Sequence, residues 1–93
     1  MAVWFVFDVP GMTREQADAV LKALDLGGKP PPGQIFHVEG PSEGGTRVVD
    51  VWESEEAFGR FFQERLTPAF QQAGVHVPEG ARPQFMPAYN ILK

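Results

Sequence analysis

The chain has 93 residues, of which 43% are hydrophobic and eight are Phe, so it can form one small domain over residues 1–93. Its formal net charge is −4, from eight Lys and Arg against twelve Asp and Glu. This balance argues against nucleic acid as a partner, because phosphate backbones require clustered basic side chains. The absence of Cys excludes disulfides, Cys-ligated zinc and thiol catalysis.

Residues 2–8, AVWFVFD, are rich in aromatic and β-branched side chains and predict a central strand that is buried on both faces. The run is too short to span a membrane and lacks the basic leader of a signal peptide. We therefore expect a cytoplasmic protein with no membrane partner.

Thr13 and Gln16 have the spacing of a capping box and predict that a helix begins after Thr13. Glycines at residues 27–28 should end this helix. Its apolar side chains recur at helical spacing and form one stripe, made of Ala17, Val20, Leu21 and Leu24.

Two strands are predicted next, at residues 34–39 and 46–53, and the glycine-containing segment 40–45 between them suits a hairpin loop. The second strand ends at Ser54, where the apolar spacing changes from two residues to the helical period. Ser54 can accept from the free N–H groups of the first helical turn.

The helix that begins at Ser54 should reach about Ala73, although Pro68 must kink it or restart it. A loop at residues 75–82 follows, and residues 83–89 predict a last strand. The element order is then βαββαβ. Right-handed crossovers give it a four-stranded antiparallel sheet with both helices on one face, which is a ferredoxin-like α+β fold.

Alternation along the two hairpin strands collects ionisable and aromatic side chains on one face of the sheet. This face is predicted to carry Ile35, His37, Glu39, Val48, Asp50 and Trp52. The hairpin pairs residues of like facing, which places His37 opposite Val48 or, after a two-residue shift, opposite Asp50.

On the first strand, alternation separates two sets of side chains. We expect Val3, Phe5 and Phe7 to face the helices and Trp4, Val6 and Asp8 to share the other face with Trp52. A mainly apolar second face is costly in water. It is therefore predicted to be a dimer interface, the lining of a ligand pocket, or both.

Residues 47–62, RVVDVWESEEAFGRFF, contain a strand, a Trp-Glu-Ser cap and an Ala-Phe-x-x-Phe helix. This segment resembles the dimeric α/β-barrel superfamily, which includes the antibiotic-biosynthesis monooxygenases, and is also similar to small members of that fold with no assigned activity. The resemblance implies a homodimer in which two sheets close a barrel around a small apolar or aromatic ligand. It also implies a cofactor-independent monooxygenase-like or isomerase-like enzyme that acts on a small aromatic or polyketide-type molecule.

Some positions depart from the family pattern. Trp52 matches, but the oxygenases that share this segment have Asn where Val48 stands and Tyr where Phe58 stands. Haem-degrading members have Trp and a ligating His where Phe61 and Gln71 stand. We therefore expect no haem or other cofactor.

The candidate catalytic residues are His37 and Asp50, because a carboxylate from Asp50 or Glu39 would orient the imidazole as a general base. Equally, His37 can be a pocket or interface residue without a catalytic role. The candidate ligand-binding residues are Trp4, Trp52, Ile35 and Val48. No metal is predicted, because His37 and Glu39 alone make a weak site.

Three functions are compatible with these patterns. The first is a small-molecule enzyme, and the second is a non-catalytic ligand-binding or accessory dimer. The third is an RNA-binding sheet, which requires exposed aromatics in a basic setting and is disfavoured by the net charge of −4. The sequence leaves the first two open.

Overall fold

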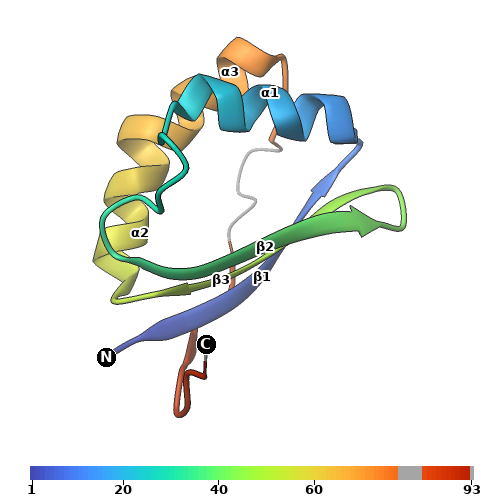
Figure 1. The fold of residues 1–93 in the computed structure, drawn as a ribbon. Helices are drawn as coiled ribbons and strands as arrows, with labels where there is room; N and C mark the ends of the chain where they lie inside the picture. Colours follow the sequence, from blue (N-terminus) through green and yellow to red (C-terminus); the bar gives the residue numbers. More distant parts are fainter. Residues whose placement is uncertain (78–82, 93) are drawn as a thin grey trace.

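A computed structural model describes residues 1–77 and 83–92 of the chain (Figure 1). Its helices and strands are, in chain order, β1 (Val3–Pro10), α1 (Arg14–Leu24), β2 (Gln34–Ser42), β3 (Gly45–Trp52), α2 (Glu55–Phe61), the π-helical turn η1 (Phe62–Leu66), α3 (Thr67–Ala73) and β4 (Met86–Pro87). None of the helices in these ranges is long and apolar enough to cross a membrane.

The strands form one four-stranded antiparallel sheet in the order β2-β3-β1-β4. The helices cover one face of this sheet, with α1 beside the continuous rod of α2, η1 and α3 (Figure 1). The predicted α+β class is confirmed, and the topology is compatible with a ferredoxin-like fold. β4 is shorter than predicted, with two residues in place of 83–89. The predicted loop at 75–82 lies partly outside the described residues.

The register between β1 and β3 decides which side chains face the helices. Val3 pairs with Trp52, and Phe5 pairs with Asp50. The helix-facing side chains of β1 are buried, and those between them are half-buried or exposed, so within one chain this strand is buried on one face and not on both as predicted. The buried set consists of Val3, Phe5, Phe7 and Val9.

This register corrects the predicted sharing of faces. Trp52 is fully buried on the helix side, whereas Trp4 alternates with the buried residues of β1 and lies on the outer face. Alternation alone is ambiguous on β3, because both faces of that strand carry large or apolar side chains. The bulk of Trp52 fits the aromatic core, where it contacts Phe58 and Phe61 with ring centroids 5.3 Å apart in each pair.

The capping prediction for α1 is confirmed. The Thr13 hydroxyl accepts from the Gln16 N–H at 3.1 Å, and the Gln16 side chain accepts from the Thr13 N–H at 3.0 Å. The helix ends earlier than predicted, because Asp25 adopts the left-handed conformation with φ of 51° and so ends it before the glycines.

The hairpin between β2 and β3 has a turn of two residues, Glu43 and Gly44, in place of the predicted six-residue loop. The two strands therefore extend into residues 40–45. At the other end of β2, Ile35 is an extra residue in a β-bulge, because Gln34 pairs with Trp52 and Phe36 pairs with the adjacent Val51.

Ser54 caps α2 as predicted, accepting from the Ala57 N–H at 3.1 Å. Before Pro68 the helix widens into η1, where the N–H of Thr67 donates to the carbonyl of Phe62, five residues back. Proline has no N–H and its ring crowds the preceding turn, so a wider turn accommodates it. The sequence predicted a kink or restart at this point but not a π turn.

Candidate functional site

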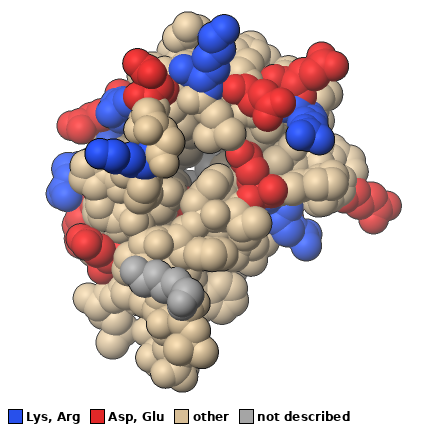
Figure 2. Space-filling view, in the orientation of Figure 1, with Lys and Arg blue, Asp and Glu red and all other residues tan. Residues whose placement is uncertain are grey.

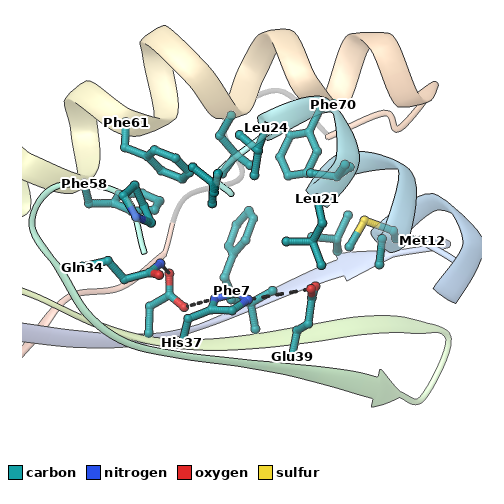
Figure 3. A pocket seen from close by; sticks show the side chains of 18 of the residues that line it. Phe7, Met12, Leu21, Leu24, Gln34, His37, Glu39, Phe58, Phe61 and Phe70 are labelled. Atoms are coloured by element: carbon teal, nitrogen blue, oxygen red, sulfur yellow. Dashed lines mark hydrogen bonds and ion pairs between the residues drawn. The ribbon is translucent and has the colours of Figure 1, made fainter. Parts of the chain in front are cut away.

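A cavity lies between the sheet and the helices (Figure 3). Its volume is about 80 Å³, and the atom-free space is about 670 Å³ when the opening toward solvent is included. An enclosed apolar cavity that binds benzene has a volume of roughly 150 Å³, so a ring bound here would extend into the opening. Aromatic and aliphatic side chains from both layers form most of its wall, namely Phe5, Phe7, Val9, Met12, Ala17, Val20, Leu21, Leu24, Leu26, Pro31, Val48, Phe58, Phe61, Leu66 and Phe70.

The polar part of the wall belongs to the hairpin of β2 and β3. Gln34, His37 and Glu39 come from β2, and Asp50 comes from β3. Because β2 is an edge strand, this polar wall lies at the margin of the sheet. In the space-filling view the molecule is hollowed between the helical layer and the sheet, with acidic side chains beside the hollow (Figure 2).

Asp50 is the centre of the polar cluster. Its side chain is 5% exposed. One oxygen, Oδ1, accepts from His37 Nδ1 at 2.6 Å, and the other, Oδ2, accepts from Trp52 Nε1 at 2.9 Å and from Gln34 Nε2 at 3.4 Å. An ionised carboxylate only accepts hydrogen bonds, so three donors satisfy it in a buried place. The hydrogen bond from the Trp52 indole thereby helps to hold the Asp50 carboxylate in place.

His37 stands opposite Asp50 in the strand register, which is the second of the two pairings that the sequence allowed. Its ring nitrogen Nε2 lies 3.7 Å from Glu39 Oε1. The hydrogen bond to Asp50 and the nearby Glu39 carboxylate raise the pKa of His37 from 6.5 to about 9, against the opposing effect of burial. At neutral pH the ring is therefore an imidazolium whose Nδ1–H is held by Asp50.

The predicted site residues separate into three groups. His37, Asp50 and Val48 line the cavity, and Trp52 lies directly behind Asp50 as its hydrogen-bond donor. Ile35 occupies the bulge and is not part of the cavity wall. Trp4 lies on the outer face of the sheet, so it does not flank a ligand together with Trp52 within one chain, and that expectation is corrected.

Sequence reasoning missed Gln34 and Leu21 as cavity residues. Gln34 faces the cavity because the bulge at Ile35 shifts the alternation by one residue, which no local signal in the sequence announces. Leu21 belongs to the predicted apolar stripe of α1, yet it is 44% exposed and lines the cavity. The sequence cannot distinguish an apolar residue of the helix that packs in the core from one that lines a cavity, because the difference depends on the packing of the other layer.

The described residues contain no group of three His, Asp or Glu side chains arranged to hold a metal ion. No family model, curated protein or solved structure matches this chain. The resemblance to the dimeric α/β-barrel superfamily therefore stays a prediction.

Proposed function

We propose that the cavity binds a small, mainly apolar molecule and that the His37–Asp50 pair acts on an oxygen atom at the ligand's polar end. The protein would then be a cofactor-independent enzyme, isomerase-like or monooxygenase-like. The observation that carries the proposal is an apolar cavity whose polar wall contains a histidine with one ring nitrogen fixed by a buried carboxylate. Mainly apolar pockets with a few converging polar groups are the usual form of small-molecule sites.

The state of His37 suggests its role. Asp50 holds Nδ1–H, which leaves Nε2 as the ring nitrogen available to a ligand. Because the pKa of His37 is raised to about 9, Nε2 carries a proton near neutral pH and donates. A positioned imidazolium stabilises negative charge that develops on an enolate oxygen, and the Glu39 carboxylate on the same wall takes up the proton that leaves the neighbouring carbon. We therefore propose that His37 acts as a proton donor, in place of the general base that the sequence suggested.

The apolar substitutions favour the isomerase-like chemistry over oxygenation. Val48 and Phe58 both line the cavity, and both stand where the resemblance has polar groups that contact a phenolic substrate. They leave the hairpin residues as the polar groups of the wall. A non-catalytic ligand-binding protein is the second candidate. The raised pKa of His37 favours it, because proton transfer is most efficient when the pKa of the catalytic group lies near neutral pH, and that of His37 is about 9.

The experiment uses propiophenone, a small aryl ketone, as the probe. Nuclear magnetic resonance in D₂O would follow deuterium exchange at the carbon next to the carbonyl, with the wild-type chain, His37→Gln and the control His76→Gln, whose side chain is exposed. We expect wild type and His76→Gln to accelerate exchange and His37→Gln to lose the acceleration. The acceleration over buffer should fall as pH rises through about 9.

The other outcomes are informative. If propiophenone shifts the amide signals of cavity residues but does not exchange faster than in buffer, the non-catalytic candidate replaces the enzyme. If His37→Gln exchanges as fast as wild type, the histidine has no role in the reaction. If no signal of a cavity residue shifts, the ligand-binding proposal is wrong.

We further propose that a second copy of the chain covers the outer face of the sheet. That face carries apolar side chains, several of them well exposed, which are Trp4, Val6, Phe36, Val38, Val49 and Val51. Its charged groups at one end, Asp8 and Arg47, pair with each other at 2.8 Å. An apolar face whose charges are neutralised internally can meet its own copy about a two-fold axis without repulsion. This interface differs from the one predicted, because Trp52 is not on it.

A further inference from the structure

His37 and Glu39 present a hydrogen-bond donor and an acceptor to the same part of the cavity, but they do not form a close hydrogen bond with each other. Both side chains extend from β2 toward the helices, with the Glu39 carboxylate below Leu21 (Figure 3). Their closest atoms, Nε2 and Oε1, are 3.7 Å apart, which is too long for a good hydrogen bond. The Glu39 side chain is 22% exposed, so it is partly withdrawn from water.

We propose that His37 Nε2 and the Glu39 carboxylate together bind a hydroxyl group of the ligand, and that Glu39 selects neutral hydroxyl compounds over carboxylates. This inference rests on the proposed binding of a small molecule in the same cavity. Glu39 is then a specificity-determining residue, whereas the sequence indicated it only as a possible partner of the His37 imidazole.

The geometry favours a hydroxyl because that group both accepts and donates. Its oxygen would accept from Nε2–H and its proton would go to the carboxylate. An oxygen that makes two ordinary hydrogen bonds separates the outer atoms by about 4.4 Å. The present gap of 3.7 Å requires only a small outward rotation of Glu39, which lies at the boundary between the cavity and a surface hollow beside α1.

The charges disfavour a carboxylate end and a purely apolar ligand. The cavity wall has one cation, His37, beside two carboxylates, Asp50 and Glu39. A carboxylate ligand would meet Glu39 as a like charge and would lack a proton to donate to it. A purely apolar ligand would leave the Nε2–H and the carboxylate desolvated without partners, which is costly.

The experiment compares benzyl alcohol, benzoate and toluene, which share one ring and one attached carbon and differ in the polar end. The titrations use the ¹⁵N-labelled full chain near neutral pH and follow amide signals of β2. The variants are Glu39→Gln and the matched control Glu43→Gln, which changes an exposed glutamate in the hairpin turn outside the cavity.

With wild type and Glu43→Gln, we expect benzyl alcohol to bind about tenfold more tightly than benzoate or toluene. With Glu39→Gln, the preference over benzoate should disappear, because the amide donates to a carboxylate as well as accepting from a hydroxyl. Equal affinity of wild type for benzyl alcohol and toluene would overturn the hydroxyl site while leaving the cavity proposal standing. Failure of all three probes to bind would overturn both.

Discussion

At the scale of single residues, Asp50 organises the site. Burial of a carboxylate is unfavourable unless its oxygens are bonded, and here the donors are His37, Trp52 and Gln34. The same bonds set the orientation of the imidazole ring. Removal of Asp50 would therefore change both the stability of the domain and the protonation of His37.

The raised pKa of His37 predicts a dependence of stability on pH. The folded-state pKa is about 9 against 6.5 in the unfolded chain, so the stabilisation is fully present below 6.5 and is lost as pH rises through about 9. The full shift corresponds to roughly 3 kcal/mol. Solvent screening of a side chain that is 32% exposed should reduce this to on the order of 2 kcal/mol.

Urea unfolding at several pH values between these limits would measure the effect. His37→Gln should flatten the curve in this window, whereas the exposed His76→Gln should follow wild type. Identical slopes for wild type and His37→Gln would show that the ring is not protonated by its contact with Asp50.

The sequence predicted part of this site. His37 and Asp50 were expected on one face because two-residue alternation applies to each regular strand, and they lie there together. It failed to predict that this face packs against the helices, because that choice depends on the register with β1 and on the volume of Trp52. Gln34 was missed because the bulge at Ile35 inserts one residue and so reverses the face to which Gln34 points, and no residue type in the sequence marks that insertion.

At the scale of elements, the start of β2 is constrained by Gly33. This glycine has φ of +92°, and a Cβ placed on it would lie 2.8 Å from the Cβ of Ala57 in α2. It also accepts a backbone hydrogen bond from the N–H of Glu53 at 2.8 Å. The close approach fixes how the edge strand that carries the polar wall meets the helix layer.

Gly33→Ala should therefore destabilise the domain by two effects, the left-handed backbone and the collision with Ala57. Gly28→Ala is a matched control, because Gly28 has φ of +78° but no atom within 4 Å of the added Cβ. We expect the control to lose about 1 kcal/mol and Gly33→Ala to lose a further 1–3 kcal/mol, roughly. Thermal or urea unfolding measures both, and equal losses would show that α2 moves aside freely.

The helix caps were predictable because each depends on residues three positions apart, as at Thr13 and Ser54. The π turn was not, because Pro68 is compatible with several distortions and the packing selects among them. One such contact is from Arg65 in η1, whose guanidinium donates to the carbonyl of Leu24 at the end of α1, at 2.5 Å. That bond joins segments 41 residues apart, beyond the reach of local patterns.

At the scale of the whole molecule, the sheet has two unlike faces. One is covered by helices and contains the cavity, and the other exposes Phe36 and Val38 at 45% and 48% of their surface. In a domain of this size an apolar sheet face is a large fraction of the surface, which is why we propose that a second copy covers it.

Light scattering at micromolar concentration should report twice the mass of one chain. Val38→Glu places a charge among the exposed apolar side chains of the outer face and should shift the mass to that of a monomer. Gln72→Glu, on the exposed side of α3, adds the same charge elsewhere and should leave the dimer intact. A folded wild-type chain that is monomeric under these conditions would contradict the proposal.

The two tryptophans make the two faces of the sheet separately visible. Trp52 is fully buried with its indole N–H on Asp50, and Trp4 is half-buried on the opposite face. These are the two tryptophans of the chain, so its ultraviolet fluorescence is the sum of one signal from behind the cavity and one from the outer face. Emission from Trp4→Phe would report occupancy of the cavity, and emission from Trp52→Phe would report contact between chains. Fluorescence of these two variants, without any added label, would therefore distinguish a ligand that enters the cavity from one that changes the contact between chains.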